Sequence, residues 1–202
     1  MNNLYAITDS QLLPGEKLFS AVGAALIGGC RLVQYRDKSS DHPRRFAEAK
    51  QLRALCAQHD AQLLINDDVE LAQKVGAQGV HLGQGDTSPV AARLLLGSQA
   101  IIGVTCHDSL ALAEQAIKDS ANYIAFGRFF PSSTKPNARP APLGLISEAR
   151  QQFPTTPIVV IGGITLENGK QLLTAGADML AVCHSLFSAD DIAAQAQQFI
   201  HL

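Results

Sequence analysis

Ile158-Val159-Val160-Ile161-Gly162-Gly163 is a run of four β-branched apolar residues followed by two glycines. A strand with one face in water alternates apolar and polar residues, whereas this run is apolar throughout. We therefore expect both of its faces to be buried, as they are in parallel sheets that helices cover on each side. The stretch predicts an α/β protein built on a parallel sheet.

Short apolar runs of the same kind recur along the chain, and segments with helical spacing separate them. We expect eight strands, at Leu4–Asp9, Arg31–Arg36, Gln62–Asn66, Gly79–Gly83, Ala100–Cys106, Tyr123–Gly127, Pro157–Gly162 and Met179–His184. Asp108 is expected to cap the helix after the fifth strand, and Thr165 to cap a helix over Leu166–Ala175. Eight strands, each followed by a helix, are typical of a (β/α)8 TIM barrel, with a doubly wound open sheet as the alternative.

Small-residue turns favour the barrel because they precede every second strand. The turns before strands two, four, six and eight are Gly28-Gly29, Gly76-Ala77, Ser120-Ala121 and Gly176-Ala177. Such turns suit the end of a helix that leads into a strand. Two strand–helix modules repeated four times predict a single (β/α)8 domain over residues 1–202.

The composition is that of a globular protein with a near-neutral charge. Of the 202 residues, 47% are hydrophobic and 17% are charged, and 16 basic against 18 acidic side chains give a net charge of −2. This balance argues against a nucleic-acid partner or a basic membrane-binding face, and no apolar run approaches the ~18 residues of a membrane span. The N-terminal segment lacks the basic region of a signal peptide, and the four cysteines form no Cys-x-x-Cys pair. We therefore expect a cytoplasmic location.

Unusual polar residues gather where the predicted strands end, which is where barrel enzymes place their chemistry. In chain order they are Gln34-Tyr35-Arg36-Asp37-Lys38, Asn66-Asp67-Asp68, Asp86, Thr105-Cys106-His107, Ser132-Ser133-Thr134-Lys135 and Gly162-Gly163. The connection from Arg128 to about Pro142 is long and carries four prolines. Connections of that length inside a compact domain are usually functional.

These residue types make an anion site beside a site for a hard cation. Arg36, Lys38 and Lys135 supply positive charge, and the hydroxyl groups of the long loop supply neutral donors. The glycine pair lets the backbone approach a phosphate at the start of a helix. Asp67 and Asp86 are oxygen ligands of the type that Mg²⁺ uses when it also holds substrate phosphates. The set predicts a site for magnesium and a polyphosphate.

Other interpretations of these residues stay open. Asp68 is better explained as a helix N-cap than as a metal ligand. His81, His107 and His184 also lie near strand ends, so a three-histidine zinc site is an alternative. His81 stands inside its strand, however, where a hydrogen-bonded core histidine is the simpler explanation. Cys183 is expected to be a small buried residue rather than a nucleophile.

The order of these motifs resembles the thiamine phosphate synthase family over nearly the whole chain. The matching segments are Tyr5-Ala6-Ile7-Thr8-Asp9, Gln34-Tyr35-Arg36-Asp37-Lys38, Ile65-Asn66-Asp67-Asp68, Gly79-Val80-His81-Leu82-Gly83-Gln84, Ser132-Ser133-Thr134-Lys135 and Ile161-Gly162-Gly163-Ile164. The resemblance implies a (β/α)8 barrel that uses Mg²⁺ and two small-molecule substrates. Such an enzyme couples 4-amino-2-methyl-5-(diphosphooxymethyl)pyrimidine with a thiazole phosphate and releases thiamine phosphate and pyrophosphate. Departure of the diphosphate before the thiazole attacks, through a pyrimidine cation, is the expected mechanism.

The resemblance also implies roles for individual residues. The catalytic set would be Arg36, Lys38 and Lys135, and the magnesium ligands would be Asp67 and Asp86. The residues implied for the pyrimidine diphosphate are Gln34, Tyr35, Arg36, Asp37, Lys38, Asn66, Thr105 and Lys135. Those implied for the thiazole phosphate are Ser132, Ser133, Thr134 and Gly163.

The chain departs from the family pattern at two places. Thr105 stands where the family often has Ser, and its hydroxyl can make the same hydrogen bond to the pyrimidine ring. Cys183-His184 stands where the family often has Val-Ser, and neither side chain is given a role.

Two alternative functions follow from the same residues. A thiazole tautomerase of the same barrel family would use His107 as acid or base, but it has no diphosphate to bind. A catalytically silent sensor of thiamine precursors would keep binding without turnover. The acidic pair and the basic residues favour the synthase, and a homo-oligomer is a further possibility.

Overall fold

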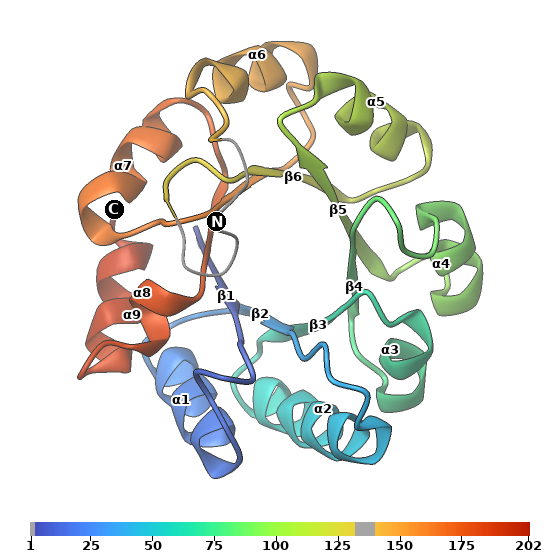
Figure 1. Cartoon of the computed structure of the whole chain (residues 1–202), viewed down its shortest axis with the longest axis vertical. Helices are drawn as coiled ribbons and strands as arrows, with labels where there is room; N and C mark the ends of the chain where they lie inside the picture. The colour runs from blue at the N-terminus through green and yellow to red at the C-terminus, as the bar shows by residue number, and fades with distance from the viewer. Residues whose placement is uncertain (1–2, 132–139) are drawn as a thin grey trace.

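Within the described residues, 3–131 and 140–202, the computed structural model has eight parallel strands that close into one barrel (Figure 1). The strands are β1 (Leu4–Ile7), β2 (Leu32–Tyr35), β3 (Gln62–Asn66), β4 (Gly79–Leu82), β5 (Ile101–His107), β6 (Tyr123–Gly127), β7 (Ile158–Ile161) and β8 (Met179–Val182). Closure is direct, because Tyr5 of β1 pairs with Leu32 of β2 on one side and with Ala181 of β8 on the other. The predicted barrel is therefore confirmed and the open sheet is excluded.

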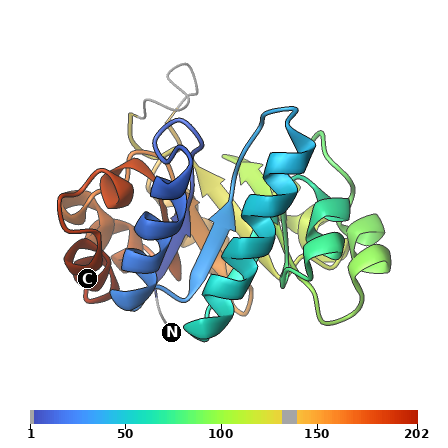
Figure 2. The ribbon, with the colours of Figure 1, turned by 90° about the horizontal axis from the view of Figure 1, so that it is seen from below.

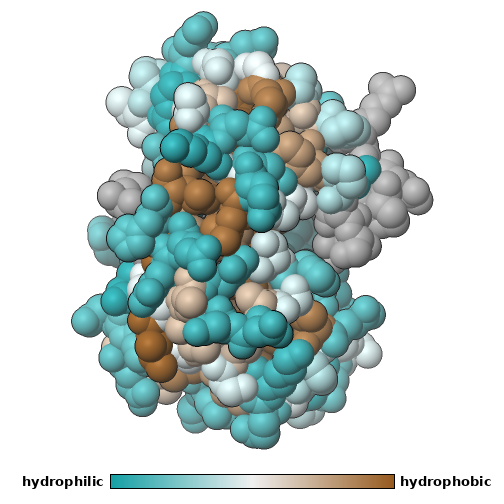
Figure 3. All heavy atoms as spheres, turned by 90° about the vertical axis from the view of Figure 1, so that its left-hand side faces the viewer, coloured by the Kyte–Doolittle hydropathy of each residue, from teal (hydrophilic) through white to brown (hydrophobic). Residues whose placement is uncertain are grey.

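Helices form an outer ring around the strands (Figures 1 and 2). They are α1 (Glu16–Ile27), α2 (His42–Gln58), α3 (Val69–Val75), α4 (Pro89–Leu96), α5 (Leu110–Lys118), α6 (Gly144–Gln152), α7 (Leu166–Thr174), α8 (His184–Phe187) and α9 (Ile192–Ile200). None of the helices in these ranges is long and apolar enough to cross a membrane. The outer face seen in Figure 3 is mainly hydrophilic, with separate apolar patches between the polar side chains.

Two of the expected helix caps hold and one is wrong. The Asp68 carboxylate accepts a hydrogen bond from the Leu71 amide at 2.9 Å, as an N-cap does, and α7 begins directly after Thr165. The helix after β5 is capped by Ser109 rather than by Asp108, because its hydroxyl accepts from the Leu112 amide at 3.3 Å. Two neighbouring residues with good capping side chains cannot be ranked without the backbone path.

Side chains still alternate between two surroundings along the fully apolar strands. On β7, Val159 belongs to a cluster inside the barrel, while Ile158 and Val160 belong to the larger cluster between strands and helices. The inner cluster also holds the aromatic ring of Tyr123. Gly103 on the neighbouring strand β5 makes room for it, because a Cβ there would overlap the ring. Odd-numbered residues of β7 therefore point into the barrel, and even-numbered residues point toward the helices. Only the side chains that point into the barrel can reach a cavity at its end.

Candidate active site

A cavity of about 260 Å³ lies at the carboxyl end of the barrel, and all eight strands or the loops after them line it. It brings together polar residues named from the sequence, among them Gln34, Arg36, Asn66, Thr105 and His107. Apolar side chains such as Val159 and Ala181 form the remainder of the wall. The cavity therefore combines a polar side with an apolar side, which is common in sites that bind a small organic molecule.

The alternation of strand β2 decides which of its residues reach this cavity. Gln34 and Arg36 lie two residues apart and line it, whereas Tyr35 and Asp37 are buried on the other side of the strand, toward α2. The predicted contacts of the Tyr35 and Asp37 side chains with the pyrimidine diphosphate stay a prediction, and Asp37 lines a second hollow together with Lys38 and Asp67. A continuous sequence motif does not place all its side chains on one face, because side chains on a strand alternate. Lys38 continues the Arg36 side and reaches Asp67.

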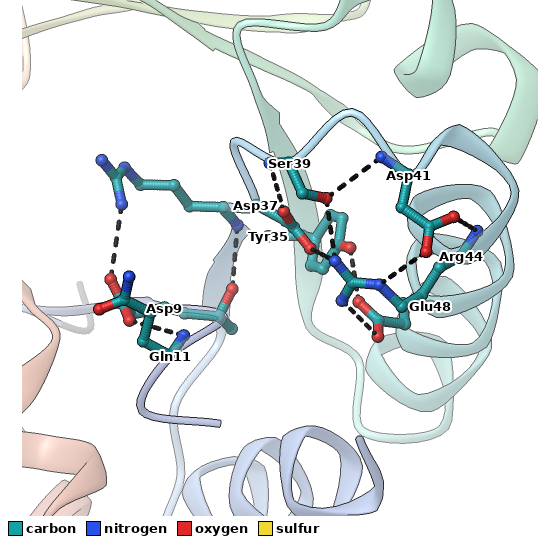
Figure 4. Close-up of polar contacts among 10 residues, drawn as sticks. Asp9, Gln11, Tyr35, Asp37, Ser39, Asp41, Arg44 and Glu48 are labelled. Carbon is teal, nitrogen blue, oxygen red and sulfur yellow. Dashed lines mark hydrogen bonds and ion pairs between the residues drawn. The ribbon is translucent and has the colours of Figure 1, made fainter. Parts of the chain in front are cut away.

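Arg36 is held in place from strand β1. Its backbone amide donates to the Thr8 hydroxyl at 2.9 Å, and its guanidinium lies 3.6 Å from the Asp9 carboxylate. Asp9 in turn accepts a hydrogen bond from the amide of Gln11 at 3.0 Å (Figure 4) and one from the amide of Leu12 at 3.1 Å. The turn after β1 therefore orients the carboxylate, and the carboxylate orients the guanidinium. Thr8 and Asp9 belong to the site, although sequence reasoning gave them no role.

On the opposite side of the β2–α2 loop, Arg44 joins three acidic side chains (Figure 4). Its guanidinium lies 2.8 Å from Asp37, 3.1 Å from Glu48 and 3.4 Å from Asp41. The Tyr35 hydroxyl donates to Glu48 at 2.6 Å. This cluster of contacts ties the loop that carries Arg36 and Lys38 to helix α2.

The environment of Asp37 lowers its pKa. Burial alone would raise the pKa of this carboxyl group, but hydrogen bonds from Ser39 and the charge of Arg44 outweigh burial. The Ser39 amide donates to the Asp37 carboxylate at 2.7 Å. The folded protein therefore favours the ionised form of this side chain.

We expect Asp37→Asn to destabilise the protein by about 1–3 kcal/mol at pH 7, because it removes a buried charge from its partners. The folded pKa lies below the unfolded value of about 3.9, so this stability is complete above that pH and is lost as the pH falls through the folded pKa. Urea unfolding of both proteins between pH 7 and pH 3 measures it. The matched control is Asp190→Asn, at an exposed site between α8 and α9. A difference between wild type and Asp37→Asn that stays constant with pH would contradict the assignment.

Asp67 and Asp86 come together at the edge of the barrel. Their carboxyl groups are in hydrogen-bonding contact; burial and the adjoining Asp67 raise the pKa of Asp86. The Lys38 ammonium lies 3.1 Å from Asp67, and the Gly83 amide donates to Asp86 at 2.7 Å. Asp67 has a left-handed backbone with φ 62°, a strained conformation of the kind that gathers at functional sites.

This acidic pair fits a magnesium ion. Two adjacent carboxylates whose repulsion raises a pKa would be relieved by a divalent cation. Within residues 3–131 and 140–202, no three metal-ligating side chains are grouped. A site with two carboxylates leaves positions for substrate and water oxygens, which is how Mg²⁺ is usually bound beside phosphates. Asp67 and Asp86 would therefore be the ligands from this chain.

The three-histidine alternative finds no support in the described part of the chain, which holds all three residues. His81 instead makes hydrogen bonds on both ring nitrogens, as expected of a hydrogen-bonded histidine inside its strand, although it is only half-buried and also lines the cavity. His107 is exposed and lines the cavity, with φ 51° directly after an irregularity in the pairing of β5 with β6. Cys183 is only partly buried and also lines the cavity, and burial raises the pKa of its thiol to about 12.

A chain of hydrogen bonds crosses the barrel, and most of its residues line the cavity. The Gln34 amide nitrogen donates to the Tyr5 hydroxyl at 2.6 Å, and the Tyr5 and Tyr123 hydroxyl oxygens are 3.0 Å apart. Tyr123 is 2.8 Å from Nδ1 of His81, whose Nε2 is 2.8 Å from the Thr105 hydroxyl. Sequence reasoning named only the two end members as site residues. Polar side chains at inward positions of predicted barrel strands are the signal that would have found the other three.

The loop proposed for the thiazole phosphate is only partly seen. Ser132, Ser133, Thr134 and Lys135 lie outside the described residues. Gly163 has φ 62° and lies against the backbone of Pro131, where a Cβ would overlap the carbonyl oxygen. This close approach requires glycine, so the position brings the loop after β6 against the turn after β7.

Known proteins resemble this chain over its whole length. A sequence profile described as thiamine monophosphate synthase matches residues 4–186. The thiamine-phosphate synthase of Saccharophagus degradans is 55% identical over 202 residues, which cover 100% of this chain and 93% of that protein.

Solved structures agree with this likeness. Thiamine phosphate pyrophosphorylase from Pyrococcus furiosus has a TM-score of 0.87 and 31% identity, over 98% of this chain and 93% of that one. 3-Hexulose-6-phosphate synthase, at 15% identity and a TM-score of 0.73 over 98% of both chains, shares the fold alone. The profile match and the two closer relatives cover the barrel and the acidic and basic strand ends together, and they show that the chain belongs to the thiamine monophosphate synthase family.

Proposed function

We propose that this enzyme joins 4-amino-2-methyl-5-(diphosphooxymethyl)pyrimidine to a thiazole phosphate, giving thiamine phosphate and pyrophosphate. The 55% identical thiamine-phosphate synthase supports this reaction. The observation that carries it is the meeting of the Asp67–Asp86 pair with Lys38, beside a cavity that Arg36 enters. An acidic pair and two cations at one edge match a diphosphate that arrives with its metal.

The cationic side chains would receive the leaving group. When the bond between the pyrimidine methylene and the diphosphate breaks, the electron pair stays on the diphosphate oxygen. Arg36 and Lys38 would stabilise that developing charge, and the sequence assigns Lys135 the same task. Magnesium held by Asp67 and Asp86 would supply further charge stabilisation of the diphosphate.

The cavity would hold the organic part of both substrates. Gln34, Asn66 and Thr105 present polar groups that can orient an aminopyrimidine ring, and the apolar wall would keep water from a reactive cation. The thiazole nitrogen attacks with its own lone pair, so the coupling step needs no general base. Orientation of the two rings is then the remaining contribution of the protein.

The thiazole phosphate would lie beyond the pyrimidine. Gly163 at the turn after β7 and the hydroxyl groups of Ser132, Ser133 and Thr134 are the proposed contacts. The support is the close approach of Gly163 to Pro131, which brings the loop after β6 to this turn.

A tautomerase that uses His107 is the less favoured function. His107 does line the cavity, so the residue that this activity needs is present. An isomerisation of a thiazole phosphate, however, gives no task to the acidic pair or to Lys38.

The direct test is to incubate the protein with both substrates and Mg²⁺. We expect thiamine phosphate and pyrophosphate in equal amounts, and neither product when one substrate or the metal is left out. A protein that forms no thiamine phosphate but interconverts thiazole isomers would overturn the proposal in favour of the tautomerase. A protein that binds both substrates without changing either would favour the sensor.

The surroundings of the enzyme are also proposals. We place it in the cytoplasm, with small molecules rather than nucleic acid or membrane as partners. All four cysteines are free thiols, which suits a reducing compartment. Sedimentation of the purified protein would measure whether it forms a homo-oligomer.

A further inference from the structure

The hydrogen-bond chain across the barrel, from Gln34 to Thr105, has a direction. A tyrosine hydroxyl has one proton to donate, and a glutamine amide nitrogen can only donate. Because Gln34 donates to Tyr5, the proton of Tyr5 is available for Tyr123. The proton of Tyr123 is then available for Nδ1 of His81. With the partners that the described residues provide, this direction gives both hydroxyl protons an acceptor.

Both tyrosines are neutral donors in this chain. They are buried, and burial raises the pKa of each hydroxyl well above its usual range. Removal of either proton would leave a buried charge in the middle of the barrel. The direction of the chain is therefore set by its two ends and not by ionisation of the middle.

The direction fixes the tautomer of His81. If Nδ1 accepts from Tyr123, the ring proton is on Nε2, which donates to the Thr105 hydroxyl oxygen. The proton of the Thr105 hydroxyl is then free to turn toward the cavity that this residue lines. A proton on Nδ1 would reverse each bond, and Gln34 would have to present its oxygen to Tyr5. The orientation of the Gln34 amide thus determines, through the chain, whether the Thr105 hydroxyl accepts from His81 or donates to it.

We propose that Tyr123 is a positioning residue that couples the Gln34 amide to the Nε2–H tautomer of His81 and so presents the Thr105 hydroxyl to the cavity as a hydrogen-bond donor. The tautomer is inferred from the contacts that run from Gln34 to His81. Its consequence for the pyrimidine ring rests on the proposed function.

The ring of Tyr123 is held independently of its hydroxyl. It stacks on His81 with centroids 5.6 Å apart and an interplanar angle of 19°. The ring of Tyr5 meets it edge-on, at 6.0 Å and 89°. Tyr123→Phe keeps these contacts and the space opposite Gly103, so it removes the hydroxyl with little change in packing.

The first measurement is the nitrogen spectrum of His81 in protein labelled with ¹⁵N-histidine and without substrate. The His81 signals are assigned by their absence from His81→Asn. We expect the wild type to show a protonated Nε2 and an unprotonated Nδ1. Tyr123→Phe should shift the equilibrium toward a mixture of tautomers, because Nδ1 loses its donor. Tyr5→Phe should do the same, because Tyr123 then no longer accepts a hydrogen bond from Tyr5, and its own proton is no longer directed toward His81.

The matched control is Tyr35→Phe, which removes the hydroxyl of the remaining tyrosine of the protein, one that is outside the hydrogen-bond chain. That hydroxyl bonds Glu48 on the outer side of β2, so the His81 spectrum should stay as in the wild type. A wild-type ring protonated on Nδ1, or a His81 spectrum that Tyr123→Phe leaves unchanged, overturns the proposal.

The second measurement is kinetic. Tyr123→Phe should lower kcat/KM for the pyrimidine diphosphate about tenfold, the worth of one misdirected hydrogen bond, and leave the KM for the thiazole phosphate unchanged. A rise of both KM values would indicate a general loss of structure and would contradict a positioning role. The tautomer is read without substrate, so a failure of the proposed coupling reaction would be seen separately in the product assay.

Discussion

Asp67→Asn is expected to lower the rate of thiamine phosphate formation by at least about 100-fold while the barrel stays folded. The substitution removes one charge of the acidic pair and keeps the size of the side chain. Asparagine also tolerates the left-handed backbone that this position adopts, with φ 62°. The loss should therefore lie in the binding of the metal and the stabilisation of the diphosphate, and not in the fold.

Asp68→Asn is the matched control for this substitution. Asp68 adjoins Asp67 in sequence, but it caps α3 and pairs with Arg45 at 2.9 Å. Asparagine is as good an N-cap as aspartate, so the variant should turn over at close to the wild-type rate. Initial rates at saturating Mg²⁺ measure activity, and circular dichroism measures the fold. Near-normal turnover of Asp67→Asn, or full wild-type activity in excess chelator, would contradict the assignment of the pair.

The barrel could be predicted because its signals are local. The apolar run from Ile158 to Ile161 requires a strand covered on both faces, and the count of such runs leaves few parallel topologies. The ends of elements depend on more than local signals. Ser109 rather than Asp108 caps α5, because a cap depends on where the chain turns and not on the capping residue alone.

The site could be predicted where strand ends meet, but not where side chains point. Arg36 reaches the cavity, as expected for a residue at the end of β2. Tyr35 and Asp37 turn to the opposite side, where Tyr35 bonds Glu48 and Asp37 pairs with Arg44, both on the following helix. The contact between Tyr5 and Tyr123 joins residues 118 positions apart, so no local pattern indicates it.

The last prediction compares Arg36 with His107, since the two proposed activities rank them in opposite order. In the synthase, Arg36→Gln should reduce turnover about 100-fold, because one charge-assisted contact to a departing oxyanion is worth ~3 kcal/mol. The turnover of Arg36→Lys should lie between that of the wild type and that of Arg36→Gln, since lysine keeps the charge and loses the planar guanidinium. His107→Ala should retain most of the coupling rate, because the thiazole nitrogen attacks without a proton acceptor.

Single-turnover formation of thiamine phosphate, with both substrates saturating, measures the bond-breaking step for the three variants. Asp9 offers a second test of the role of Arg36, because the Asp9 carboxylate lies 3.6 Å from the Arg36 guanidinium and orients that group. Asp9→Asn should therefore weaken turnover less than Arg36→Gln and in the same step. If His107→Ala proves the more damaging variant and Arg36→Gln is nearly silent, acid–base chemistry at the end of β5 governs the reaction, and the charge-stabilising role of Arg36 would have to be abandoned.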